Sequence, residues 1–376
     1  MARPTKRKKT KKAAPRKVRA KARKTTKIRA QAIAPDSGPV TLDEARTLAQ
    51  AKKPSLAVQA VRKTAAPPAS PAAVGAERQK LKKEQRDERA RRVREYKATM
   101  EIMKNRGARR PRPKGLRAAD GEPTAQAAQS FAPLQIFAEG DSWFDYPYPF
   151  FGGSIIPRLE QRLGVPILNL AKAGDEVRFM LGVEERAVLT QHLTDGCPAG
   201  GPWDVLLFSG GGNDIVGNPM ALWISNWNPA MPPADHIKKA RFEAALALVR
   251  AAYEDLIAVR DSLSPGTHLV FQGYDFAIPD GRGVCNLGPW LKPTFDLCKF
   301  PTLAAGRAVV RAMLEQFAAM LTSLAGPKVT FINGQGTLAP QTSSWHNELH
   351  PAKAGFETFA DVFQQKLKVL FPDRVA

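Results

Sequence analysis

From about residue 132 onward, short apolar runs alternate with longer amphipathic stretches, and this alternation constrains the fold more than any other feature. The apolar runs predict strands at 134–138, 166–170, 205–209, 268–272 and 329–332. The amphipathic stretches predict helices at 154–163, 183–193, 237–263, 303–324 and 351–370. Strands that alternate with helices indicate a parallel sheet with helices on both faces. In such an α/β fold, loops that bind ligands lie at the carboxyl ends of the strands.

Basic side chains are concentrated in the N-terminal third of the chain. Residues 1–120 contain 37 Lys and Arg against 10 Asp and Glu, and the rest of the chain contains the remaining 20 and 25. The first 30 residues contain 15 basic residues and no acidic one, a composition typical of disorder. We therefore expect a basic extension over 1–130, largely disordered but with a charged helix at about 76–104, followed by a globular domain over 131–376.

The basic extension has two interpretations. Residues 1–120 bind a polyanion, such as nucleic acid or an anionic surface, or they form a charged, solubilising segment without a dedicated partner. The sequence near Met1 has no apolar core of a signal peptide, and no apolar run reaches the roughly 18 residues of a membrane span. With three cysteines, an odd number without metal-binding spacing, these features predict a cytoplasmic protein.

Three polar segments follow predicted strands. They are Gly140-Asp141-Ser142-Trp143, Gly211-Gly212-Asn213-Asp214 and His346-Asn347-Glu348-Leu349-His350-Pro351. Alone, each is a weak signal that also fits an ordinary loop. Together they offer a hydroxyl nucleophile, an amide donor and an imidazole base, which are the groups that acyl transfer through serine requires. Pro351 indicates that the two histidines lie in a loop rather than on one helix face, so we expect no metal and no organic cofactor.

The order and spacing of these segments, with Ala173-Gly174-Asp175 after the second strand, resemble the SGNH/GDSL hydrolase family over about residues 132–370. The resemblance implies a flavodoxin-like, three-layer α/β/α sandwich on a mostly parallel five-stranded sheet. It implies that Ser142 is the nucleophile, that His350 is the general base, and that Gly174, Asn213 and the Ser142 backbone N–H form an oxyanion hole. The implied reaction is ester hydrolysis of the esterase, lipase or deacylase type through an acyl-enzyme on Ser142.

One position departs from the family pattern. The family usually has Asp three residues before the catalytic histidine, where this chain has Asn347. An amide oxygen can accept the imidazole N–H, but it supplies no charge. Three outcomes are open: Asn347 suffices, a carboxylate replaces it, or the site is weakened and serves binding. The candidate carboxylates are Asp145, Asp214, Asp275 and Glu348.

The third outcome defines an alternative function for the whole chain. It is a catalytically weakened SGNH-fold binding module that the basic tail tethers to nucleic acid or another polyanion.

Aromatic residues close to these segments predict an apolar pocket for the acyl or aromatic part of a substrate. The expected lining residues are Trp143, Phe144, Tyr146, Tyr274 and Trp345. For any single residue, packing in the core is an equally good interpretation, because aromatic side chains are mostly buried. The long irregular segment 273–301 predicts a lid or binding loop.

Overall fold

The computed structural model describes residues 38–51, 71–109, 130–146, 153–284 and 287–375. The basic segment 1–37, which the sequence predicts to be disordered, lies outside the described residues. The described residues from Gly38 onward belong to one compact unit, which contains the helices before residue 110 as well as the sheet.

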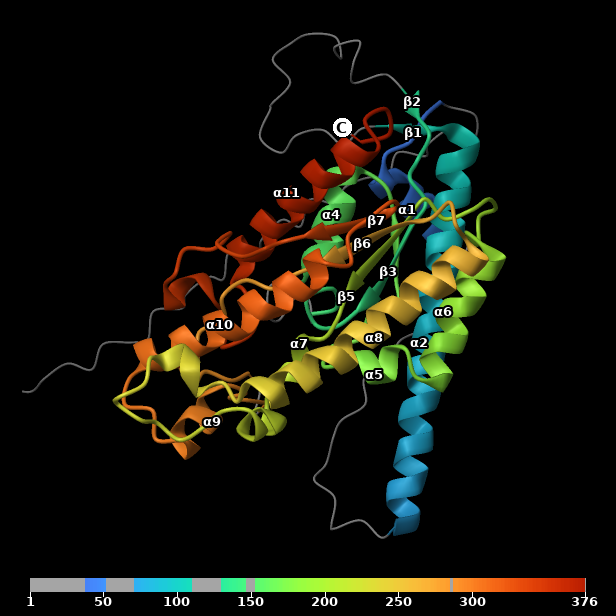
Figure 1. The fold of residues 1–376 in the computed structure, drawn as a ribbon. Helices are drawn as coiled ribbons and strands as arrows, with labels where there is room; N and C mark the ends of the chain where they lie inside the picture. The colour runs from blue at the N-terminus through green and yellow to red at the C-terminus, as the bar shows by residue number, and fades with distance from the viewer. Residues whose placement is uncertain (1–37, 52–70, 110–129, 147–152, 285–286, 376) are drawn as a thin grey trace, which may run out of the picture. The chain divides into compact units, whose positions relative to one another are not determined.

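A parallel sheet of five strands forms the centre of this unit, in the order β4-β3-β5-β6-β7 (Figure 1). The strands are β3 (Ile136–Gly140), β4 (Ile167–Asn169), β5 (Val205–Ser209), β6 (His268–Gln272) and β7 (Val329–Ile332). Strands covered on both faces are buried and mostly apolar, and every residue of β3 and β5 is buried. The predicted α/β fold with a parallel five-stranded sheet is confirmed.

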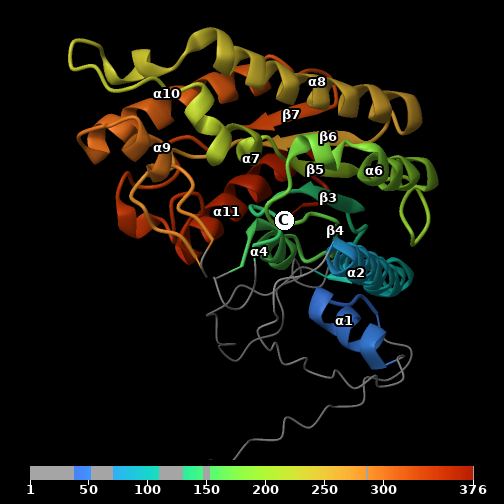
Figure 2. The ribbon, with the colours of Figure 1, turned by 90° about the horizontal axis from the view of Figure 1, so that it is seen from below.

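The helices form one layer on each face of the sheet, and the order of the strands explains which helix lies where. Figure 2 shows α4 (Ile155–Leu163) and α11 (Lys353–Leu370) on one face, with α6 (Val183–Asp195), α8 (Lys239–Leu263) and α10 (Leu303–Thr322) on the other. The chain leaves β3 toward β4 and then returns past β3 to β5, so right-handed crossovers place α4 and α6 on opposite faces. The loops after β3 and β5 therefore diverge at a topological switch point, where ligands bind in open α/β sheets.

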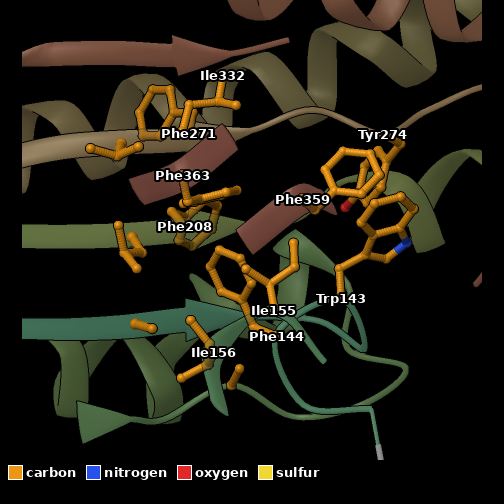
Figure 3. Close-up of a cluster of buried hydrophobic side chains, with 14 of the residues drawn as sticks. Trp143, Phe144, Ile155, Ile156, Phe208, Phe271, Tyr274, Ile332, Phe359 and Phe363 are labelled. Carbon is orange, nitrogen blue, oxygen red and sulfur yellow. The ribbon is translucent and has the colours of Figure 1, made fainter. Parts of the chain in front are cut away.

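Aromatic side chains fill the space between the sheet and the helix that closes it. Phe144 packs against Phe363 of α11, with ring centroids 6.0 Å apart, and Trp143 packs edge-on against Phe359 of the same helix at 5.0 Å. In Figure 3, Phe144 and Phe363 lie within the core, whereas Trp143 lies beside Tyr274. The packing of Trp143 and Phe144 against α11 thus anchors the loop after β3 to the core.

Two helices precede the sheet. Helix α1 (Leu42–Ala51) begins with a capping box, in which Thr41 N–H donates to Glu44 Oε2 at 2.8 Å. Helix α2 (Pro71–Arg106) carries exposed charges over 79–87, as expected of a solvated charged helix. Its second half differs from that expectation, because Tyr96, Met100 and Met103 are buried. Their spacing of four and three residues places them on one helix face, which packs against the unit.

Short elements complete the described fold. They are β1 (Ala108–Arg109), β2 (Ser130–Phe131), α5 (Val177–Met180), α7 (Gly212–Ile215), α9 (Lys292–Leu297), and the 3₁₀ turns Asn218–Leu222, Pro233–His236 and Thr342–Ser344. Strands β1 and β2 pair with each other as a separate antiparallel ladder. Within the described ranges, none of the helices has an apolar stretch long enough to traverse a bilayer.

Glu139, the residue before Gly140 in β3, makes the stability of the fold depend on pH. Burial raises the pKa of its carboxyl from 4.5 to about 8; Arg89 opposes this shift, and Glu185 and Asp175 add to it. The native state therefore binds this proton more tightly than the unfolded chain. The protonated Glu139 carboxyl makes its full contribution to the free energy of unfolding below pH 4.5, and this contribution is lost as the pH rises toward 8. We expect Glu139→Gln to flatten the decrease in urea-unfolding free energy over this range. An unchanged pH dependence would contradict the assignment.

Candidate active site

The loop after β3 and the segment before α11 bring a hydroxyl and an imidazole together. Ser142 Oγ lies 2.7 Å from His350 Nε2, although 208 positions separate the two residues in the chain. Gly140 allows the turn, because a Cβ at this position would lie 2.6 Å from the carbonyl oxygen of Ser209 on β5. The Asp141 N–H donates to that same oxygen at 3.0 Å. Ser142 therefore leaves the sheet at the switch point with its hydroxyl directed at His350.

Asn347 determines the orientation and the protonation of the His350 ring. Asn347 Oδ1 lies 2.9 Å from each of three nitrogens, the backbone nitrogens of Leu349 and His350 and the ring nitrogen Nδ1 of His350. Backbone N–H groups only donate, so the side-chain atom that faces them is the amide oxygen. That oxygen only accepts, so Nδ1 carries the ring proton and the lone pair of Nε2 faces Ser142.

Tyr146 contacts both His350 and Asn347. Its ring stacks on the His350 ring, with centroids 4.1 Å apart and an interplanar angle of 17°. Its hydroxyl accepts from Asn347 Nδ2 at 3.1 Å and lies 2.8 Å from His346 Nδ1. Four contacts thus join five side chains in a line from Ser142 through His350, Asn347 and Tyr146 to His346.

Burial lowers the pKa of His350 to about 3, and the charge of His346 adds to the effect. No carboxylate of the described residues is a hydrogen-bond partner of the ring, and Asn347 is fully buried. The imidazole is therefore neutral, and able to accept a proton, over a wide pH range. The charged form is correspondingly costly, because neither solvent nor an anion stabilises it.

The four candidate carboxylates are each engaged elsewhere. Asp145 accepts from Arg92, and Asp214 accepts from the Val177 N–H. Asp275 accepts from the N–H groups of Gly336 and Leu338. Glu348 accepts from four backbone N–H groups, those of Gly281, Trp290, Leu291 and Lys292. Among the described residues, the imidazole nitrogen Nδ1 contacts Asn347 itself and none of these four carboxylates. Glu348 instead holds Gly281 and residues 290–292, and the Trp290 ring lies edge-on to His350 with centroids 6.1 Å apart.

The other two residues of the predicted oxyanion hole, Gly174 and Asn213, follow β4 and β5. Gly174 has φ +79°, a left-handed conformation that favours glycine, and the space where a side chain would project is open. The side chain of Asn213, from α7, donates one Nδ2 hydrogen to the Asp175 carbonyl at 2.8 Å, which fixes the amide and leaves its second hydrogen available. Within the described residues, the backbone N–H groups of Ser142 and Gly174 donate to no protein acceptor.

Asp141 and Tyr274 tie the loops after β3 and β5 together. The Tyr274 hydroxyl donates to Asp141 Oδ2 at 2.5 Å and accepts from the Gly212 N–H at 3.1 Å. The other carboxylate oxygen of Asp141 accepts from the Trp143 N–H at 2.9 Å. Burial raises the pKa of Asp141 to about 6, although its hydrogen bonds, that from Tyr274 foremost, oppose the shift. These contacts join the loop that carries Ser142 to the loop that carries Asn213.

A cavity of about 40 Å³ opens beside Ser142 and Asn213. Trp143 and Tyr274 line it, as expected. The structure places Phe144, Tyr146 and Trp345 outside its lining: Phe144 packs in the core, Tyr146 stacks on His350, and Trp345 packs edge-on against Trp143. The rest of the wall is mainly apolar and was missed from the sequence. Its apolar residues are Ile215, Val216, Ala277, Leu291, Val310, Met313, Leu314 and Leu349, and Asp141, Gly212 and Asp275 complete the lining.

No protein-family model and no curated protein matches the sequence. Among solved structures, an extracellular lipase from Streptomyces rimosus is similar at 18% identity, over 62% of this chain and 99% of that one, with a TM-score of 0.40. A GDSL-like lipase from Parabacteroides merdae is similar at 17% identity (62% and 95%, TM-score 0.34), and an SGNH hydrolase from Slackia heliotrinireducens at 14% (62% and 99%, 0.34). Structure comparison thus finds this chain similar to proteins described as GDSL-like lipases and SGNH hydrolases.

Proposed function

We propose that this protein is a serine hydrolase of the SGNH/GDSL type, which cleaves a carboxylic ester through an acyl-enzyme on Ser142. One observation carries the proposal: Ser142 Oγ, His350 and Asn347 Oδ1 form a continuous line of contacts of 2.7 and 2.9 Å. A nucleophile within hydrogen-bond reach of a base, with a third group orienting that base, is the arrangement that nucleophilic catalysis needs.

The proposed reaction has two steps. His350 Nε2 takes the proton of Ser142 as Oγ attacks the ester carbonyl, and the developing oxyanion accepts from the N–H groups of Ser142, Gly174 and the Asn213 amide. His350 then passes the proton to the departing alcohol, which leaves an acyl group on Ser142. A water molecule gives its proton to His350 and attacks the acyl carbon, and return of that proton to Ser142 releases the acid.

The neutral Asn347 leaves the charged imidazole of this reaction without a partner anion, and Tyr146 offers partial compensation. A cation over the face of an aromatic ring gains roughly 0.5–2 kcal/mol, and the rings of Tyr146 and His350 are stacked. Replacement of the Asp in a serine-protease triad by Asn costs about 10⁴ in turnover, close to 5.5 kcal/mol. That loss is an upper bound here, because it includes selection of the wrong tautomer, whereas Asn347 Oδ1 selects the tautomer that the mechanism needs. We therefore expect a slow esterase rather than an inactive one.

Hydrolysis of a simple ester tests the proposal. Purified full-length protein should hydrolyse 4-nitrophenyl acetate and butyrate with saturation kinetics, because both acyl groups are small and apolar like the cavity beside Ser142. Absence of turnover of these and of longer esters would contradict the proposal. The alternative, a weakened module tethered to a polyanion, has no supporting observation within the described ranges, and residues 1–37 lie outside them.

The size of the cavity predicts which acyl chains are preferred. Met313 lies in its wall, so Met313→Ala should lengthen the space for an acyl chain. Each buried methylene contributes about 0.8 kcal/mol, so the ratio of kcat/KM for the hexanoyl ester over the butyryl ester should rise roughly tenfold. Met320→Ala, on the same helix but outside the cavity lining, is the matched control and should leave the ratio unchanged. Equal ratios in both variants would exclude Met313 from the acyl site.

A further inference from the structure

We infer that Arg92, on helix α2, is a positioning residue for the active site, an inference that rests on the proposed ester hydrolysis. Three of its contacts reach the end of β4 and the loops after β3 and β4, which carry Ser142 and Gly174. Arg92 Nη1 donates to the carbonyl oxygens of Asn169 and Ala171, both at 3.1 Å, and Nη2 donates to Asp145 Oδ1 at 3.1 Å. The guanidinium thus joins the loop after β3 to the loop after β4.

Each contact lies close in sequence to a group of the proposed mechanism. Asp145 precedes Tyr146, whose ring stacks on His350, and its N–H donates to the Asp141 carbonyl within the nucleophile loop at 3.0 Å. Ala171 lies three residues before Gly174. Displacement of either loop would therefore move the oxyanion donors relative to Ser142.

Two further hydrogen bonds join the same two loops without involving the guanidinium. Asn169 Nδ2 donates to the Phe144 carbonyl at 2.8 Å, and the Lys172 N–H donates to the Gly140 carbonyl at 2.9 Å. Arg92 adds the only cation among these contacts and neutralises Asp145. Burial raises the pKa of Asp145, whereas Arg92 lowers it, so the pair depends on the guanidinium to keep the carboxylate charged.

The position of β4 explains why an arginine is needed. Strand β4 is at the edge of the sheet, so carbonyl groups on its outer side have no neighbouring strand to donate to them. A guanidinium carries five N–H donors in a planar fork and can bind two carbonyls and a carboxylate together. A lysine ammonium is a compact charge without that geometry, so Arg92→Lys should not restore the full bridge.

Helix α2 is itself held firmly, so it can act as a support. Tyr96 OH lies 3.6 Å from Cys197 Sγ, and its ring packs against Trp203 with centroids 5.6 Å apart. Lys104 Nζ donates to the Gly200 carbonyl at 2.7 Å, and Met100 and Met103 are fully buried. Arg92 thus projects from a helix that packs along the sheet edge, and the segment before residue 110 contributes to catalysis rather than only carrying charge.

The test compares Arg92→Ala with Arg91→Ala in the full-length protein. Arg91 is a matched control, because its ion pairs, to Glu88 and Glu95, stay within α2. We expect Arg92→Ala to lower kcat for 4-nitrophenyl butyrate roughly 10- to 100-fold, with KM changed less than about threefold, because displaced catalytic groups affect the transition state while the cavity wall is untouched. Arg92→Lys should recover part of kcat, and Arg91→Ala should stay within about twofold of wild type.

A second readout separates this inference from the proposed function. Amide hydrogen exchange over residues 170–176 should be faster in Arg92→Ala than in Arg91→Ala, whether or not the chain hydrolyses esters. Asp145→Asn, which keeps the arginine on the two carbonyls, provides a milder variant if Arg92→Ala does not fold, and should lower kcat several-fold. Wild-type kcat and wild-type exchange in the Arg92 and Asp145 variants would overturn the inference. An inactive wild-type chain would instead overturn the proposed function.

Discussion

Replacing Ser142 by alanine should lower kcat for 4-nitrophenyl butyrate by about 10⁴- to 10⁶-fold, the range seen when the nucleophile of a serine hydrolase is removed. The hydroxyl is the only group of the site that can form the acyl-enzyme in the proposed mechanism, and its oxygen lies 2.7 Å from the base. Removing one buried oxygen should leave the fold intact, because Ser142 Oγ has no other hydrogen-bond partner among the described residues. Steady-state kinetics measure kcat, and the thermal unfolding midpoint of each variant measures its stability.

The control for this experiment is another buried serine close to the same loop. The Ser154 hydroxyl donates to the Phe144 carbonyl at 2.8 Å and does not contact His350. Ser154→Ala should lower stability by about 1 kcal/mol while kcat changes little. A loss of less than about tenfold in Ser142→Ala would show that the measured hydrolysis arises elsewhere.

Replacing Asn347 by alanine should lower kcat by about 10²- to 10⁴-fold, which approaches the effect of removing the third member of a catalytic triad. The substitution removes the acceptor of two backbone N–H groups and of His350 Nδ1–H in a fully buried position. The ring then loses the contact that selects its tautomer. Unsatisfied buried donors also cost about 1–3 kcal/mol each, so the unfolding free energy should fall measurably.

The companion variant Asn347→Asp tests the electrostatic part of the account. Aspartate keeps the acceptor and adds the charge that the site lacks, so it should raise the pKa of His350 by about 1–3 units. The base acts only when neutral, so kcat/KM falls as the pH drops through this pKa. Wild type, with a His350 pKa of about 3, should keep its kcat/KM well below pH 6.5, the ordinary imidazole value. In Asn347→Asp the acid limb should move to higher pH. A wild-type limb near pH 6.5 would contradict the assigned environment.

The strands could be predicted closely because buried parallel strands are short apolar runs bounded by polar residues. The strands β5, β6 and β7 begin and end where the pattern predicts. Strand β3 begins two residues later than predicted, at Ile136. Leu134 is apolar and buried, but the Gln135 N–H donates to Asp204 Oδ2 rather than to a neighbouring strand. A hydropathy pattern predicts which residues are buried, but it does not predict which acceptor a backbone N–H donates to.

Site residues that directly follow a strand could be predicted from the sequence. Residues that a helix brings to the site could not, because the sequence does not show how that helix packs. Ser142 and Asn213 come directly after β3 and β5, so the topology alone brings their loops to one edge of the sheet. Met313 belongs to an amphipathic helix whose apolar face is visible in the sequence, but the sequence does not show that this face borders Ser142. Arg92 is one of many charges in α2, and only the packing of that helix reveals that it meets β4.

Labelling with a fluorophosphonate tests the central claim most directly, because the reagent forms a covalent adduct only with an activated serine. Intact-mass spectrometry and peptide mapping should find a single adduct on Ser142 in the wild type. The rate of labelling should fall by at least about 10³-fold in His350→Ala, and Ser142→Ala should not react at all. A wild-type chain that does not label, or a Ser142→Ala chain that labels as fast as wild type, would contradict the proposed catalytic site.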